Sequence, residues 1–182
     1  TTTNVGGLLI GSEHPVRIQT MANTSTNDIE GSLAQAERCI AAGTELLRFT
    51  TQGMREVESL AQIHQSLQGV ARSTANDVSD LPSTAQRSHT PLVADVHFQS
   101  DVADAAAKVV EKVRINPGNY IDPARKFKQI DYTDEEYQAE LQRLRTRFIQ
   151  LLDICKEHNA ALRIGVNHGS LSDRIMSRYG DT

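Results

Sequence analysis

The chain has 182 residues, of which 38% are apolar and 23% charged, and its formal net charge is −4 at pH 7; these values are typical of one soluble globular domain with a sizeable core. The negative charge, the lack of Trp and an aromatic content of 4% argue against a nucleic-acid-binding surface, which needs basic residues and aromatic stacking platforms. No apolar run reaches the roughly 20 residues of a membrane span and no secretory signal opens the chain, so we expect a cytoplasmic protein without a membrane partner.

The first elements predict a hairpin. Short apolar segments at residues 5–10 and 15–21 flank Gly11-Ser12-Glu13-His14, and this composition predicts two paired strands that lead into a first core strand at residues 16–20. Gln19 on that strand and Asn23 in the polar loop after it are possible ligand contacts, although an ordinary strand position explains Gln19 almost as well.

Helices and strands then alternate along the rest of the chain. Asn27 followed by Glu30 resembles a capping box, and apolar residues at helical spacing lead from it to a stop at Gly43. Further strands are predicted over residues 45–50, 91–98, 112–116 and 160–166, and further helices over residues 54–67 and 100–110, from Thr133, and from Ser170. The helix from Thr133 has a capping box with Glu136 and a core-facing stripe of Tyr137, Leu141, Leu144, Phe148, Leu151 and Cys155.

Residues 68–90 break this rhythm, since they are rich in Ser, Thr, Ala and Asp and show weak periodicity. A link of this length inside a domain is uncommon, and we interpret it as a surface insertion in which His89 is solvated. His64, in the helix before it, receives no role.

The two cysteines, Cys39 and Cys155, fall inside helical patterns, and neither belongs to a CxxC motif. Buried free thiols, as expected in a reducing cytosol, are therefore favoured over a disulfide or a metal role.

Polar side chains stand where the predicted strands end. Arg48, Arg114 and Arg163 each follow a short apolar run, and arginine is almost never fully buried without a partner. Residues two apart on a strand share a face. Asn116 is therefore in phase with Arg114, Gly165 and Asn167 are in phase with Arg163, and Asp95 is in phase with His97. Cations fixed at a rigid rim suit a phosphate or carboxylate ligand better than a core.

The alternation predicts an α/β fold with parallel strands and right-handed crossovers. Open doubly wound sheets and barrels both place sites at strand carboxyl ends, and the nucleotide fingerprints GxGxxG and GxxxxGKS/T are missing. We favour a TIM-type (β/α)8 barrel. Because about five β/α units cannot close one, residues 1–182 are expected to be the hairpin and N-terminal part of a barrel in a longer protein. Pro117-Gly118 is predicted to end one strand in a sharp exit.

Several motifs together resemble one enzyme family. Val-Ala-Asp-Val-His-Phe at 93–98, Arg-Ile-Asn-Pro-Gly-Asn at 114–119, Arg-Ile-Gly-Val-Asn-His-Gly-Ser at 163–170, Gln-Thr-Met-Ala-Asn-Thr at 19–24 and Leu47-Arg48 resemble the 4-hydroxy-3-methylbut-2-enyl diphosphate synthases of the non-mevalonate isoprenoid pathway. Residues 130–133 and 167–181 resemble the longer, three-domain form. The similarity spans nearly the whole chain and is weakest over residues 68–90.

The resemblance implies an oxidoreductase of terpenoid biosynthesis whose barrel binds 2-C-methyl-D-erythritol 2,4-cyclodiphosphate and whose reaction opens that ring by a two-electron reduction. It also implies a C-terminal domain with a 4Fe–4S cluster on three cysteines and a glutamate, a homodimer, and an external electron donor of the ferredoxin or flavodoxin type. The family's substrate contacts carry over to Arg48, Asp95, His97, Arg114, Asn116, Arg163 and Asn167, with Gln19, Asn23, His168 and Ser170 as possible further contacts.

Cys39 and Cys155 match no cluster motif, so we expect no metal ligands and no catalytic residue in this part of the protein, which would be inactive alone. An unclosed barrel exposes strand edges that favour self-association. Two alternatives stay open: another anion-binding barrel enzyme of the pterin-binding synthase or methyltransferase type, and a non-catalytic module that binds a phosphorylated metabolite.

Overall fold

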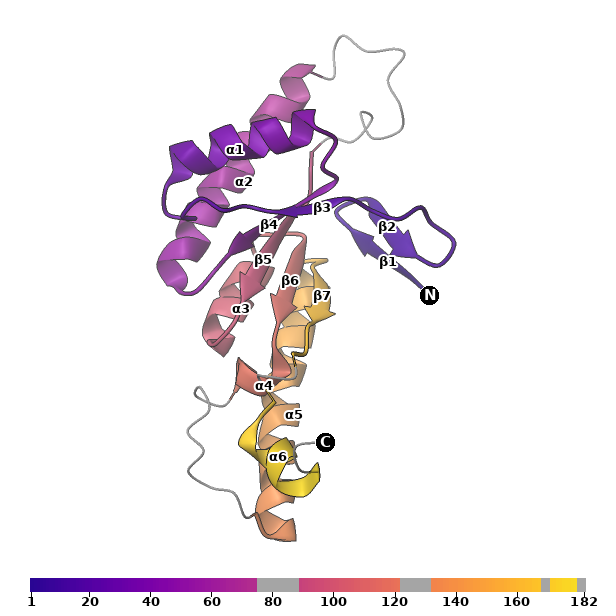
Figure 1. Ribbon diagram of the computed structural model, residues 1–182, viewed down its shortest axis with the longest axis vertical. Coiled ribbons are helices and arrows are strands. Elements are labelled where there is room, and N and C mark those ends of the chain that lie inside the picture. Colours follow the sequence, from indigo (N-terminus) through magenta and orange to yellow (C-terminus); the bar gives the residue numbers. More distant parts are fainter. Residues whose placement is uncertain (75–88, 122–131, 168–170, 180–182) are drawn as a thin grey trace.

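A computed structural model describes residues 1–74, 89–121, 132–167 and 171–179, with only the backbone described for residues 69–74. The strands are β1 (Thr2–Val5), β2 (Leu8–Gly11), β3 (Gln19–Met21), β4 (Leu46–Thr50), β5 (Leu92–Val96), β6 (Lys112–Ile115) and β7 (Ala161–Ile164). The helices are α1 (Ile29–Ala41), α2 (Met54–Thr74), α3 (Ser100–Ala107), α4 (Pro117–Tyr120), α5 (Asp134–Glu157) and α6 (Asp173–Tyr179). Figure 1 shows the strands β3 to β7 side by side, with the β1–β2 hairpin set apart from them.

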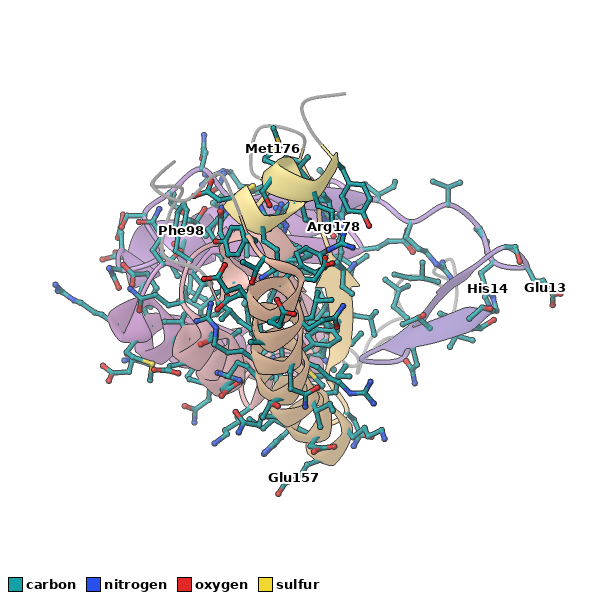
Figure 2. The ribbon with its side chains drawn as sticks, turned by 90° about the horizontal axis from the view of Figure 1, so that it is seen from below. Glu13, His14, Phe98, Glu157, Met176 and Arg178 are labelled. Carbon is teal, nitrogen blue, oxygen red and sulfur yellow. The ribbon has the colours of Figure 1, made fainter. Side chains whose placement is uncertain are left out.

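β1 and β2 pair antiparallel, which confirms the predicted hairpin but not its strands. The turn between them is Gly6-Gly7, with φ of +55° and +90°, and two successive positive φ values favour glycine over all other residues. The predicted turn also exists, since the His14 amide donates to the Gly11 carbonyl at 3.1 Å. It leads away from the hairpin, however, and Figure 2 shows Glu13 and His14 projecting from the rest of the molecule.

The strands β3 to β7 form one parallel sheet whose spatial order equals their order in the sequence. A barrel wall has this order, whereas in a doubly wound sheet the spatial order of the strands reverses on either side of the first strand. The predicted first core strand is present, but its predicted bounds of residues 16–20 are wrong, because β3 begins only at Gln19. The segment before it is held instead by Arg17, which donates to the Leu9 carbonyl at 3.0 Å and to Glu45 at 3.1 Å, and Val16 is 95% exposed.

One face of the sheet packs against the helices α1, α2, α3 and α5. Leu47 and Phe49 of β4, Leu92 and Ala94 of β5 and Val113 of β6 lie in this core, all of them at most 1% exposed. These residues alternate along each strand with those of the opposite face, as expected for a pleated strand. None of the described helices combines the length and apolarity needed to cross a membrane.

The opposite, inner face of the sheet carries an apolar cluster at its amino-terminal end. There the hairpin residues Val5 and Leu8 pack on Leu46 and Val93, and Ala161 contacts the same small cluster. The hairpin therefore closes the amino-terminal end of the inner face, and on β4, β5 and β7 the positions two residues further along carry polar side chains. The sequence of β4 reads Leu46 then Arg48, and that of β5 reads Val93 then Asp95.

The predicted helices are present, although some of their predicted ends are wrong. The N-cap of α1 is Asp28, which accepts from the Gly31 amide at 3.0 Å. The predicted Asn27 cap is wrong because the Asn27 amide donates to Glu56 of α2 at 2.7 Å and ties the two helices together. The predicted capping box of Thr133 is present at the start of α5. On α5 the predicted stripe faces the core, through the buried Tyr137, Leu151 and Cys155 and the partly buried Leu144 and Phe148.

α2 continues to Thr74, so the prediction of an irregular link from residue 68 is wrong for its first seven residues, and residues 75–88 lie outside the described part. His89 is also not solvated. Its side chain is 19% exposed and its Nε2 lies 2.9 Å from Glu111 Oε1. The described end of the predicted insertion therefore packs against the start of β6.

Candidate anion-binding site

The predicted strand-end residues lie on the inner face of the sheet, beyond the layer covered by the hairpin. Register places Asp95 beside Arg114 and Arg114 beside Arg163 on neighbouring strands. Arg48 stands beside Val93, which lies two residues before Asp95 and on the same inner face of β5. Three arginines that are far apart in sequence therefore line one surface, as the strand phases predict.

Asp95 lies at the centre of this surface and is 1% exposed. Its Oδ2 accepts from Arg48 Nη2 at 2.5 Å and lies 3.0 Å from His97 Nε2, while its Oδ1 accepts from Arg114 Nη1 at 3.1 Å. A single buried carboxylate thus holds two guanidinium groups in fixed positions. Because both of its oxygens are engaged, Asp95 fixes the positions of the two guanidinium groups.

Arg114 is 5% exposed and is fixed from a second side by Gly165, which follows β7. Its Nη2 donates to the Gly165 carbonyl at 3.3 Å. A Cβ atom on Gly165 would lie 2.5 Å from Arg114 Nε, which is far inside van der Waals contact. The absence of a side chain at residue 165 therefore makes room for this guanidinium.

Two arginine features point to a ligand. Arg48 Nε is buried and has no acceptor among the described residues, and an unsatisfied buried donor is costly unless something accepts from it. Arg163 is exposed, and no described residue forms a hydrogen bond or ion pair with it. The surface thus offers donors that the described protein groups leave unused.

Lys112 belongs to the same surface and was not predicted as a site residue. It lies two residues before Arg114 on the inner face of β6, and burial together with the charges of Arg163 and Arg48 lowers its pKa from the usual value. Burial is the larger cause of this shift, and the two nearby arginines add to it. The period-2 rule that selected Asn116 on one side of Arg114 also selects Lys112 on the other.

Asn116 lies in phase with Arg114, but part of its side chain has a structural task. Its Oδ1 accepts from the Gly118 amide at 3.2 Å and caps α4, which begins with Pro117. The predicted sharp exit at Pro117-Gly118 is therefore wrong, because both residues lie within that short helix. Proline suits the first helical position, where its missing N–H is not needed.

The remaining predicted residues lie around this centre or outside the described part. Gln19 pairs with Leu46, two positions before Met21, which stands beside Arg48. Asn23 Oδ1 accepts from Gln35 Nε2 at 2.6 Å, which fastens its loop to α1. Asn167 is exposed after β7, and His168 and Ser170 lie outside the described residues.

The sequence holds two cysteines and no more. Cys39 on α1 is partly buried and Cys155 on α5 is buried, and neither is in a disulfide. A 4Fe–4S cluster takes about four ligands, most of them thiolates, so these residues do not fit such a group.

The fold defines an α/β protein of the parallel-barrel type, and the arginine surface at the carboxyl ends of its strands is the candidate anion-binding site. Residues 1–182 match the family model described as the GcpE TIM-barrel domain. The chain therefore belongs to this family, which confirms both the predicted fold class and the resemblance.

Relatives of known name agree with this assignment. The chain is 57% identical over 179 residues to the 4-hydroxy-3-methylbut-2-en-1-yl diphosphate synthase (flavodoxin) of Bacteroides fragilis, covering 98% of this chain and 26% of the relative. It is 44% identical over 179 residues to the same-named protein of Protochlamydia amoebophila, covering 98% and 25%. It is 42% identical over 181 residues to the chloroplastic, ferredoxin form of Arabidopsis thaliana, covering 100% and 22%. The chain thus spans about a quarter of the length of these relatives.

Proposed function

We propose that this chain is the substrate-binding part of a 4-hydroxy-3-methylbut-2-en-1-yl diphosphate synthase and that it binds 2-C-methyl-D-erythritol 2,4-cyclodiphosphate on its inner sheet face. The names of the relatives and the family match support the reaction. The observation that carries the binding proposal is the pair of guanidinium groups fixed by Asp95, with the unsatisfied Arg48 Nε beside them.

The geometry suits a diphosphate for electrostatic reasons. Arg48, Lys112, Arg114 and Arg163 bring four basic side chains to a surface on which Asp95 is the central carboxylate. Arginine presents donors in a planar fork that matches two phosphate oxygens at once. Because Asp95 and Gly165 hold the guanidinium of Arg114 before any ligand arrives, little side-chain entropy is lost on binding.

The residues of this chain bind and orient the ring but do not supply electrons. Arginine, lysine, aspartate and histidine side chains are not redox carriers, so a reductive ring opening depends on a cofactor. We propose that a separate iron–sulfur domain of a homodimeric, cytoplasmic enzyme meets this need. The names of the relatives include flavodoxin and ferredoxin, and they support an electron donor of this type.

The binding proposal is tested by calorimetric titration of the cyclic diphosphate into this chain and into Arg163→Met, Arg48→Met and Arg114→Met. Arg163→Met is the sharpest variant, because no described residue pairs with Arg163 and the fold should not change. Loss of one charged hydrogen bond of about 1.5–3 kcal/mol should weaken binding roughly tenfold or more. Arg143→Met, on the exposed face of α5, is the matched control and should leave the affinity unchanged. Wild-type affinity in all three strand-end variants, Arg163→Met, Arg48→Met and Arg114→Met, would refute the site.

A second experiment tests the proposal that this chain neither holds the iron–sulfur cluster nor catalyses the reduction alone. Anaerobic reconstitution with iron and sulfide should leave the chain without a stoichiometric cluster and without turnover under a strong reductant. Visible absorption and product analysis are the readouts. A stoichiometric cluster with turnover from these residues alone would contradict the proposal.

A further inference from the structure

A second group of polar side chains lies at the other end of the sheet, where the strands begin. His64 comes from the middle of α2, His89 from just before β5, and Glu111 from just before β6. The Nε2 atoms of His64 and His89 lie 2.6 Å and 2.9 Å from the same oxygen, Glu111 Oε1. One ligand atom from each of the three residues lies within 4.8 Å of the others.

Glu111 is fixed by contacts that leave this oxygen to the histidines. Its Oε2 accepts from the Leu92 amide at 2.9 Å, and its backbone carbonyl accepts from the Ala161 amide at 2.8 Å. The hairpin turn packs on its stem, because a Cβ on Gly6 would lie 2.5 Å from Glu111 Cγ. Although burial opposes its ionisation, hydrogen bonds from His64, His89 and Leu92 lower the pKa of Glu111 to about 2.

The two imidazoles are arranged around the carboxylate at an angle to each other. The ring centroids lie 6.0 Å apart with an interplanar angle of 83°, so the rings do not stack and each directs Nε2 to the same point. A tetrahedral zinc ion with bonds of about 2.1 Å separates its ligand atoms by roughly 3.4 Å. The two separations from Glu111 Oε1, 2.6 Å and 2.9 Å, are within about 1 Å of that value, and a cation would replace the shared protons with small side-chain movements.

The donor set and the access route both suit a metal ion. Two histidines and one carboxylate are a set that zinc uses, with a further position for water. The three side chains are partly buried, with exposures of 13–19%. They line a hollow of about 320 Å³ that is also lined by Lys108 and His158, so an ion can enter from solvent.

We propose that His64, His89 and Glu111 form a binding site for a divalent transition-metal ion of the zinc type. The site joins α2, the start of β5 and the start of β6, and it lies at the opposite end of the strands from the arginine surface. A bound ion would fasten His89, just before β5, to α2 and to the amino-terminal end of the sheet. This inference does not depend on the proposed reaction.

The test is a calorimetric titration of the chelator-treated, metal-free chain with Zn²⁺, together with Co²⁺ absorption, which reports the ligand geometry. We expect one ion per chain and a rise in melting temperature with added zinc, because an ion that binds only the folded state stabilises it. His64→Gln, His89→Gln and Glu111→Gln should each weaken binding by about 100-fold or more. Circular dichroism identifies any variant that fails to fold, and the two histidine variants keep the Glu111 anchor intact.

Two matched controls separate this site from adventitious binding. His14→Gln removes a histidine that contacts Thr2 on the projecting segment, and Cys39→Ser with Cys155→Ser removes both thiols. Zinc affinity and stoichiometry should be unchanged in both controls. Wild-type affinity in the folded His64→Gln/His89→Gln double variant, or an equal loss in the His14→Gln control, would overturn the proposal.

Discussion

Replacing Asp95 with asparagine tests whether one carboxylate organises the arginine surface. The substitution keeps the shape of the side chain but removes the charge that compensates Arg48 and Arg114. The remaining Oδ1 can accept from one guanidinium, and the new amide group then faces the other, so at least one charged hydrogen bond of about 1.5–3 kcal/mol is lost. Breaking a buried ion pair by removing one partner costs about 3–5 kcal/mol. The Arg48 side chain is 20% exposed and can regain water, so we expect about 3 kcal/mol of destabilisation, at the lower end of that range.

Urea denaturation followed by circular dichroism measures this loss, with the midpoint shifted at an unchanged m-value. Asp134→Asn is the control, because it breaks an exposed pair with Arg178 and should cost under about 1 kcal/mol. The cyclic diphosphate should also bind more weakly to Asp95→Asn, since the guanidinium groups are no longer held in place. A destabilisation below about 1 kcal/mol with unchanged ligand affinity would refute the central role of Asp95.

Three further predictions follow from single contacts. Gly165→Ala should displace the Arg114 guanidinium, because the new Cβ would lie 2.5 Å from its Nε. Calorimetry should then show roughly tenfold weaker binding of the cyclic diphosphate, and unchanged affinity would contradict the steric role of Gly165. Burial raises the pKa of Tyr120 to about 12, so the folded state holds its proton more tightly than the unfolded chain and stability should fall as pH rises from about 10 to 12; in Tyr120→Phe that fall should be smaller, and equal slopes would count against it. Burial also raises the pKa of the Cys155 thiol, so a thiol reagent at pH 8 should modify Cys39 first, as peptide mapping would show, and faster labelling of Cys155 would disagree with its burial.

The sequence by itself determined the alternation of elements and the faces of the strands. Strand phase requires only that side chains point to opposite sides at successive residues, so Arg48, Asp95, Arg114 and Arg163 could be assigned to one surface without coordinates. Local chemistry likewise determined the Thr133 cap of α5 and the Gly43 stop after α1. Such signals depend only on residues that are neighbours in the sequence, so they can be predicted without the tertiary structure.

Only the tertiary structure decided which of these residues contact one another. Asp95 could be placed in phase with His97, but its bonds to Arg48 and Arg114 depend on the register of three strands. Asn116 shares a face with Arg114, yet its Oδ1 caps α4.

The cluster of His64, His89 and Glu111 is the clearest example of contacts that the sequence does not predict. His64 and His89 lie 47 and 22 residues before Glu111 in the chain, the first within a predicted helix and the second within the segment of weak periodicity. Packing of α2 and of the strand starts brings them to one oxygen, and no periodicity in the sequence records a contact made between separate elements.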